Sequence, residues 1–337
     1  MDYSKDVMTE HYTHLARTAL KAYSFREDQP LAPQQAALRE KYAELLRIPQ
    51  PFIAPPRIEY TGTDHSDYDE IRFHIESEPG FFLPAHLLLP KKRKAGQKLP
   101  VVICLQGHST GMHISLGRAK FPGDQEFIDR KKEDFALQCI RRGYAAVAME
   151  QRAFGELKTK IPEVRVCQQV AMQALLVGRT LLGERVYDIS RLVDALSHFP
   201  ELDMQRISMM GQSGGGTAAY HAAALEPRIR AVLTSCAFNR YDRSILPIYH
   251  CCCNYVPGFL ENFEMCDLAM LIAPRPLLVV CGRDDDIFPL EGVQDAFETV
   301  RKIYRAAGDS HACRMVVGQG GHRFYPEEAW PIFETMI

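Results

Sequence analysis

The residues best suited to chemistry lie at positions 211–215, which read Gly-Gln-Ser-Gly-Gly. This G-x-S-x-G pattern follows an apolar run that predicts a buried strand, and it precedes small residues that predict a helix. A serine on so tight a turn has strained backbone angles, and its glycine neighbours avoid a Cβ that would collide with the strand or the helix. The turn would present the Ser213 hydroxyl in front of the positive end of a helix. The pattern alone favours a nucleophile no more strongly than a flexible turn.

The partners that a nucleophilic Ser213 needs are present further along the chain. A serine hydroxyl requires a general base and a group that orients the base. His322 follows the last predicted strand on a loop that begins Gly-Gly, and Asp284, Asp285 and Asp286 follow the preceding strand. The order Ser, Asp, His is the order expected with such a turn. We favour Asp285, three residues after a glycine and four before a proline, and leave its two neighbours open.

The elements that must position these residues form a mostly parallel sheet. Residues 57–61, 69–77 and 81–89 predict strands, and the Glu-Pro-Gly turn at 78–80 makes them an antiparallel edge. Beyond them strands alternate with helices, which predicts right-handed crossovers and an α/β fold with helices on both faces. One long helical stretch is expected over 166–199. Further strands are expected at 99–105, 143–149, 229–237, 276–281 and 313–317, besides the strand that ends at Ser213.

The chain divides into two parts. Residues 1–56 predict a helical N-terminal extension, because apolar residues recur at helical spacing and prolines between 49 and 56 then stop helix formation. Residues 57–337 form the predicted catalytic domain, and 239–271 interrupts its alternation as an inserted lid. The extension could pack on the core, cap the site or form a subunit contact.

Composition excludes several classes of partner. The 337 residues carry a net charge of -2, with 46% hydrophobic and 24% charged residues, so neither nucleic acid nor a membrane surface is expected as a partner. The first residues show no signal-peptide pattern. Most of the ten cysteines lie in apolar patterns, which favours a reduced, cytoplasmic protein. The sequence leaves open whether the chain forms a homo-oligomer.

Six short motifs carry a resemblance to a known group of proteins. They are the turn at 211–215, Gly-Arg-Asp-Asp-Asp-Ile-Phe-Pro at 282–289, Gly-Gly-His at 320–322, Leu-Gln-Gly-His at 105–108, Glu-Gln-Arg-Ala-Phe-Gly-Glu at 150–156 and Leu-Ile-Ala-Pro-Arg-Pro-Leu-Leu at 271–278. Together they resemble the α/β-hydrolase superfamily, in particular its dienelactone-hydrolase-like and acetyl-xylan-esterase-like branch. The likeness covers the chain from about residue 57 to its C-terminus and implies an α/β-hydrolase fold with a mostly parallel central sheet.

The resemblance implies a serine-dependent hydrolase that cleaves small carboxylic esters, such as acetyl esters of sugars, through an acyl-enzyme. Ser213 would be the nucleophile, Asp285 the orienting acid and His322 the base. The backbone N–H groups of Gly214 and His108 would form the oxyanion hole. No cofactor is expected.

Two departures limit the resemblance. Dienelactone hydrolases use a cysteine nucleophile where this chain has a serine, and the loop after the fourth strand differs from that of cephalosporin-deacetylating esterases, so their hexameric assembly and sugar preference are not transferred. In that loop we expect Arg152 to form a structural ion pair. Gln106, Gln212 and Tyr255 are the candidates for the substrate pocket.

The run Cys251, Cys252 and Cys253 could suggest a metal site. Adjacent cysteines do not easily direct their sulfurs at one tetrahedral ion, and no second pair has C-x-x-C spacing. We therefore expect no metal, and we favour lid packing near the pocket over a redox role. Peptidase or C–C bond hydrolase activity on the same triad, and a non-catalytic binding protein, are the alternative functions.

Overall fold

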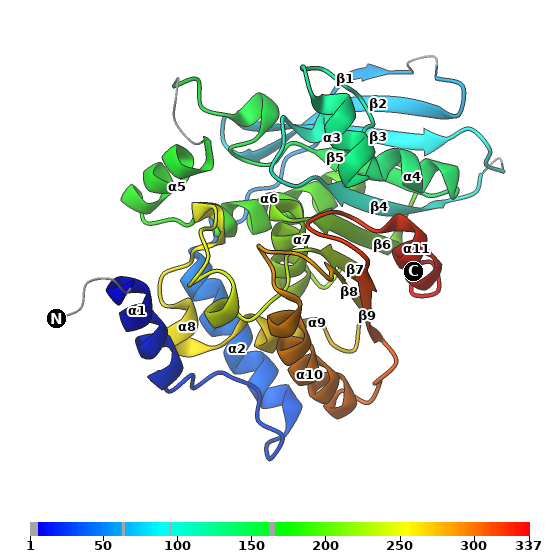
Figure 1. Ribbon diagram of the computed structural model, residues 1–337. Coiled ribbons are helices and arrows are strands. Elements are labelled where there is room, and N and C mark those ends of the chain that lie inside the picture. The colour runs from blue at the N-terminus through cyan, green and yellow to red at the C-terminus, as the bar shows by residue number, and fades with distance from the viewer. Residues whose placement is uncertain (1–5, 63–64, 95, 162–165) are drawn as a thin grey trace.

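The architecture is taken from a computed structural model, which describes residues 6–62, 65–94, 96–161 and 166–337 (Figure 1). Its centre is a nine-stranded sheet in the order β1-β2-β3-β5-β4-β6-β7-β8-β9. The strands are β1 (Arg57–Thr61), β2 (Tyr68–Glu78), β3 (Phe81–Pro90), β4 (Leu99–Leu105), β5 (Ala145–Met149), β6 (Leu202–Gln212), β7 (Ile229–Ser235), β8 (Leu277–Gly282) and β9 (Cys313–Gly318).

Strand direction divides the sheet into an antiparallel edge and a parallel remainder. β1, β2 and β3 pair antiparallel, and β3 pairs antiparallel with β5. All later pairs, from β5–β4 to β8–β9, are parallel. Gly80 adopts φ +79° in the turn between β2 and β3, a conformation that glycine reaches without strain. The predicted α/β class and its antiparallel edge are confirmed.

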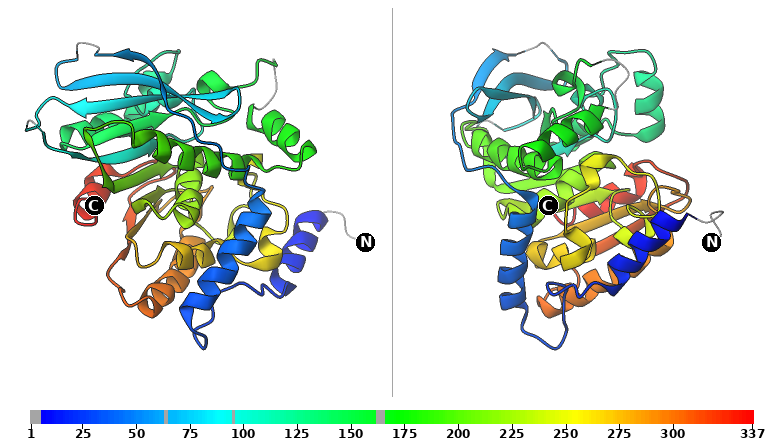
Figure 2. Two further views of the ribbon diagram at one scale, coloured as in Figure 1. Left: turned by 180° about the vertical axis from the view of Figure 1, so that it is seen from behind. Right: turned by 90° about the vertical axis from the view of Figure 1, so that its left-hand side faces the viewer.

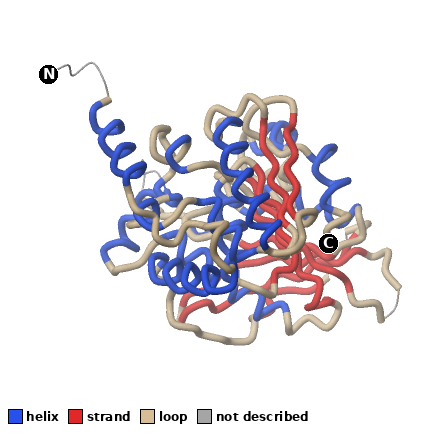
Figure 3. The backbone as a smooth tube through the Cα atoms, turned by 90° about the horizontal axis from the view of Figure 1, so that it is seen from below, coloured by secondary structure: helices blue, strands red, loops and turns tan. Residues whose placement is uncertain are grey.

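Helices cover both faces of the sheet, as Figures 2 and 3 show. On one face α6, α7 and α10 pack over the strands, and on the other face lie α4 and α11. The helices are α1 (Val7–Thr18), α2 (Leu31–Leu46), α3 (Asp124–Lys131), α4 (Phe135–Arg141), α5 (Val166–Leu176), α6 (Leu181–Leu196), α7 (Gly214–Leu225), α8 (Phe259–Asn262), α9 (Ala269–Ile272), α10 (Leu290–Ala306) and α11 (Pro326–Phe333).

The long helix expected over 166–199 is instead two helices, so that prediction is wrong. α5 ends before Gly178, which adopts φ +76° and cannot continue a right-handed helix in that conformation. Thr180 then caps α6, and its side chain accepts a hydrogen bond from Gly183 N at 3.0 Å. The break turns α5 away from the sheet, where it contacts the segment around Asn254 (Figure 1).

The first helices pack on the catalytic part of the chain. α2 lies against α6, α7 and α9, and Leu38, Tyr42 and Leu46 on its inner face are fully buried in the main core. The Tyr42 hydroxyl contacts Nδ1 of the buried His221 on α7. α1 is largely exposed and touches the short helix at Tyr241–Arg243. α2 therefore shares one core with the sheet.

Residues 239–271 contain only short helices, among them α8 and α9, and much of this segment is buried. Along the chain it lies between β7 and β8, beyond the end of β7. The lid role remains a prediction. Among the helices that the structure describes, none has the length and apolar character needed to cross a membrane.

We predict that Leu38→Ala lowers the free energy of unfolding by about 2 to 5 kcal/mol, because it opens a cavity at a fully buried position. Urea unfolding followed by tryptophan fluorescence and circular dichroism would measure the change. Glu40→Ala, an exposed position on the same helix, is the matched control and should change stability by less than about 0.5 kcal/mol. Equal stability of the two variants would contradict a shared core.

Candidate active site

Ser213 sits between the end of β6 and the start of α7. Its backbone angles are φ 52° and ψ -122°, an unusual conformation for a residue with a side chain. The position is held from both sides, because Ser213 N donates to Ser235 O on β7 at 2.8 Å and Thr217 N donates to Ser213 O at 2.8 Å. The strained strand–turn–helix that the sequence predicts is therefore present, and the side chain is half-buried.

Two glycines of the turn are required by close backbone approach. A Cβ on Gly211 would collide with the carbonyl of Gly215, and a Cβ on Gly215 would collide with the carbonyls of Leu105 and Gln106. The end of β6, the first turn of α7 and the end of β4 therefore touch through their backbones. This contact positions the Ser213 turn against the loop that follows β4.

The loops after β8 and β9 bring Asp285 and His322 together. Nδ1 of His322 lies 2.9 Å from Oδ2 of Asp285. The other carboxylate oxygen of Asp285 accepts hydrogen bonds from the backbone N–H groups of Ile287 and Phe288 at 2.9 and 3.0 Å. Asp285 is buried, whereas Asp284 and Asp286 are exposed. Asp285, the aspartate favoured from the sequence, is thus the one that contacts the histidine.

The surroundings keep Asp285 ionised. Burial would raise its pKa, but the hydrogen bond and charge of His322 and the two backbone N–H groups outweigh burial and lower the pKa. Cys236, which the sequence analysis did not single out, also lies here, with its Sγ within 4.8 Å of the ligand atoms of Asp285 and His322. Burial and the Asp285 charge raise the pKa of this thiol. The Cys236 thiol is therefore a neutral neighbour of the pair. In the sequence, its position directly after β7 was the available sign that it lies near the site.

The predicted oxyanion groups lie on both sides of the turn. Gly214 N is the first N–H of α7, where helical N–H groups lack intrahelical acceptors. The His108 ring packs over Gly214, since a Cβ there would lie 2.6 Å from His108 Cε1. Gly107 N is occupied, because it donates to Glu133 Oε2 at 2.8 Å. Glu133 is buried and was missed by the sequence analysis, since nothing in its local pattern indicates this contact.

A pocket of about 830 Å³ reaches this site at His108, whose ring packs over Gly214; Ser213, Asp285 and His322 are not among its lining residues. Tyr255 and His108 line it, as expected for Tyr255. Gln106 and Gln212 do not: both are fully buried, and Gln106 Nε2 donates inward to Glu150 Oε1 at 3.2 Å. The expectation that these two glutamines line the pocket is corrected, because residues at the ends of central strands are covered by the next loop. Further lining residues are Phe121, Phe154, Lys158, Met172, Tyr249 and His250.

Two charged residues of the 150–156 motif have structural partners. Glu150 accepts hydrogen bonds from Gln106 and from the backbone N–H groups of Met112 and Glu156. It thereby links the loops after β4 and β5. Arg152 is buried and forms ion pairs, which confirms its predicted structural role. Its carboxylate partners are Glu78, Glu184 and Asp188, at 2.8, 3.2 and 2.7 Å.

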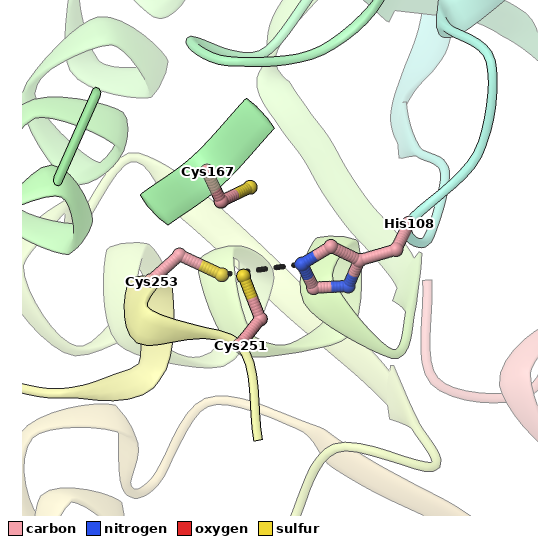
Figure 4. A group of neighbouring side chains, drawn as sticks. All are labelled: His108, Cys167, Cys251 and Cys253. Carbon is pink, nitrogen blue, oxygen red and sulfur yellow. Dashed lines mark hydrogen bonds between the residues drawn. The ribbon is translucent and has the colours of Figure 1, made fainter. Parts of the chain in front are cut away.

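A second group of reactive side chains lies next to the pocket, and Figure 4 shows how its members face one another. It consists of His108, Cys167 of α5, Cys251 and Cys253, and their ligand atoms all lie within 4.8 Å of one another. Cys253 Sγ is 3.3 Å from His108 Nε2. Hydrogen bonds with Cys251 and Cys253 lower the pKa of the Cys167 thiol well below its ordinary value. No local sequence pattern indicates this group, because His108 and Cys167 are distant along the chain from Cys251 and Cys253.

The nine-stranded, mostly parallel sheet with helices on both faces has the α/β-hydrolase fold. Residues 120–248 match the family model of acetyl xylan esterase (AXE1). The chain is 27% identical over 248 residues to the protein named "Putative hydrolase YtaP" of Bacillus subtilis (strain 168), and the alignment covers 71% of this chain and 77% of that protein.

Solved structures share the whole architecture. A putative acetyl xylan esterase from Bacteroides fragilis superposes with a TM-score of 0.76 at 18% identity, covering 94% of this chain and 82% of that one. A glucuronoyl esterase from Solibacter usitatus superposes with a TM-score of 0.66 at 15% identity, covering 94% and 96%. The α/β-hydrolase fold and the resemblance to the acetyl-xylan-esterase-like branch are confirmed.

We predict that Glu150 makes stability depend on pH. Burial raises the pKa of Glu150 to about 7, whereas in the unfolded chain it is about 4.3. Between these values the folded protein holds a proton that the unfolded chain has released, so stability from this group is complete at low pH and is lost as pH rises toward 7. Relative to Glu150→Gln, the wild type should lose up to about 3 kcal/mol over this range.

Urea unfolding midpoints of the wild type and Glu150→Gln between about pH 4.5 and 8 would measure the difference. Glu126→Gln, at an exposed position, is the control and should follow the wild-type curve. Parallel curves for wild type and Glu150→Gln would refute the prediction.

Proposed function

We propose that this chain is a serine-dependent hydrolase that cleaves carboxylic esters through an acyl-enzyme. The observation that carries the proposal is the hydrogen bond between Asp285 and His322 at the same edge of the sheet as the strained turn of Ser213. The Ser213 turn and the Asp285–His322 pair are linked through the end of β7. Ser213 N donates a hydrogen bond to Ser235 O, and the next residue, Cys236, lies against Asp285 and His322. This is the set of groups that nucleophilic catalysis by serine requires.

In the proposed reaction the Ser213 hydroxyl attacks the ester carbonyl while Nε2 of His322 takes its proton. The same nitrogen then donates that proton to the leaving alcohol. Water attacks the resulting acyl-enzyme with His322 again as base, which releases the carboxylic acid and restores Ser213. Asp285 holds Nδ1–H of His322 and stabilises the imidazolium in both halves of the reaction.

The negative oxygen of each tetrahedral intermediate would be stabilised by the N–H groups of Gly214 and His108. Gly214 adds the positive end of α7. His108 N is the favoured second donor because the preceding N–H, of Gly107, already donates to Glu133. Each well-placed donor of this kind contributes about 3 to 4 kcal/mol to transition-state stabilisation.

The pocket and the names of the relatives support a proposal for the substrate class. The similar proteins named above are called acetyl xylan esterase and glucuronoyl esterase, and a methylesterase shares the fold with a TM-score of 0.62 at 20% identity. We therefore propose small esters of carbohydrates, acetyl esters first, as substrates. The aromatic residues Phe121, Phe154 and Tyr255 line the pocket, and aromatic side chains are common partners of the apolar faces of sugars.

The remaining assignments are also proposals. Residues 1–56 serve as an extension that supports the core through α2, and residues 239–271 serve as a lid that supplies Tyr249–Tyr255 to the pocket wall. A cytoplasmic location is supported by the ten cysteines, all of them free thiols and most of them buried. Self-association would be tested by light scattering coupled to size-exclusion chromatography.

We predict that Ser213→Ala lowers kcat for 4-nitrophenyl acetate by about 10⁶-fold, because no other hydroxyl replaces the nucleophile. The wild type, but not the variant, should be labelled by a fluorophosphonate probe, with the label on Ser213. The control is Ser310→Ala at an exposed position, which should retain both activity and labelling. An undiminished rate in Ser213→Ala would remove the proposed mechanism, and a wild type that neither hydrolyses esters nor takes the label would favour a binding protein.

We predict unequal effects along the acidic run. Asp285→Asn should lower kcat by about 10⁴-fold, because the amide would favour the wrong tautomer of His322. Asp284→Asn and Asp286→Asn, which are exposed, should stay within a few-fold of the wild type. Steady-state kinetics of the three variants, with melting temperatures to confirm folding, would decide. Wild-type turnover in Asp285→Asn would show that another acid orients His322.

A further inference from the structure

The group formed by His108, Cys167, Cys251 and Cys253 has the composition of a metal site. Three sulfurs and one imidazole nitrogen converge from the loop after β4, from α5 and from the segment before α8 (Figure 4). In a tetrahedral zinc site with Zn–S bonds of about 2.3 Å, ligand atoms lie about 3.7 Å apart. The mutual distances here, all within 4.8 Å, match that spacing with little rearrangement.

The order of the cysteines permits this geometry. Cys251 and Cys253 are separated by one residue, and Cys253 lies in a short helix at Cys252–Asn254 that turns the chain between them. Cys251 and Cys253 can therefore direct their sulfurs at one ion, because the intervening Cys252 is not needed as a ligand. Two hydrogen bonds hold this segment in place. Tyr255 N donates to Cys252 O within the segment, and Thr217 Oγ1 on α7 donates to Asn254 Oδ1.

The charge of the surroundings supplies independent evidence. Arg185 is 2% exposed, and its guanidinium donates to Arg152 O and, at 3.4 Å, to Cys167 Sγ. Within the described part of the chain no carboxylate pairs with Arg185, whereas the neighbouring Arg152 has three. A buried cation without an anion is costly. Three thiolates around a divalent ion carry a net charge of -1, which Arg185 would neutralise.

We propose that His108 Nε2 and the sulfurs of Cys167, Cys251 and Cys253 bind a zinc ion. Three thiolates and one imidazole form a closed, four-coordinate set that leaves no position for water, so the site is structural rather than catalytic. Binding releases the three thiol protons and changes no oxidation state. Soft sulfur ligands in tetrahedral array favour zinc over the hard cations Mg²⁺ and Ca²⁺.

The zinc ion would connect three segments that surround the pocket. His108 belongs to the loop that supplies the proposed oxyanion N–H, Cys167 belongs to α5, and Cys251 and Cys253 belong to the proposed lid. This inference does not depend on the hydrolase mechanism, because it rests on different atoms and is measured without substrate.

The first experiment measures bound zinc. Protein expressed in zinc-supplemented medium and dialysed against a metal-free buffer would be analysed by plasma mass spectrometry. We expect about one zinc ion per chain in the wild type. Cys167→Ser and Cys253→Ser should lose it, whereas Cys252→Ser, which removes the neighbouring thiol, should keep it. Circular dichroism would establish that each variant is folded.

The second experiment keeps the inference testable if a ligand variant does not fold. Wild-type protein, stripped by a chelator under reducing conditions, would be titrated with Co²⁺. We expect the visible bands of tetrahedral cobalt and a thiolate-to-cobalt charge-transfer band, both displaced by Zn²⁺ and unchanged in Cys252→Ser. Wild-type protein without zinc that also lacks these bands, or a disulfide among these cysteines in protein purified without oxygen, would overturn the proposal.

Discussion

The site depends on one steric constraint, the backbone contact between the end of β6, the first turn of α7 and the end of β4. Only glycine fits at 211 and 215, because any side chain there would meet a backbone carbonyl of a neighbouring segment. The contact forces Ser213 into its strained conformation and brings the loop with His108 over Gly214. The proposed nucleophile and the proposed oxyanion donors are thus positioned by one backbone packing contact, before any polar interaction is considered.

Buried carboxylates then hold the loops around this contact. Glu133 binds the N–H of Gly107, Glu150 binds the N–H of Met112, and Asp285 binds two N–H groups of its own loop besides His322. Each carboxylate is buried, so breaking one of its hydrogen bonds would leave an unsatisfied charged or polar group in the interior. These hydrogen bonds connect the loops that follow the strands to buried groups of the protein interior.

Two buried arginines on the same side of the molecule have different partners. Arg152 is neutralised by carboxylates and joins β2, the loop after β5 and α6. Arg185, one turn away from Asp188 on α6, faces thiols instead. This contrast connects the proposed zinc site with the core, since an anionic cluster next to Arg185 would complete the charge balance that carboxylates provide for Arg152.

The fold was predictable from local sequence, and the candidate site residues were predictable in part. Strand and helix patterns and the glycine-rich turn at 211–215 are short-range signals, since each reflects steric or chemical needs of adjacent residues. The loops that carry the aspartates and His322 were found from their places after successive predicted strands. Three matters required the tertiary structure. Burial selected Asp285 for contact with His322 rather than its exposed neighbours. Packing of the next loop placed Gln106 in the interior. Most clearly, the group around Cys253 joins segments far apart in the chain, and no local pattern encodes which distant side chains meet.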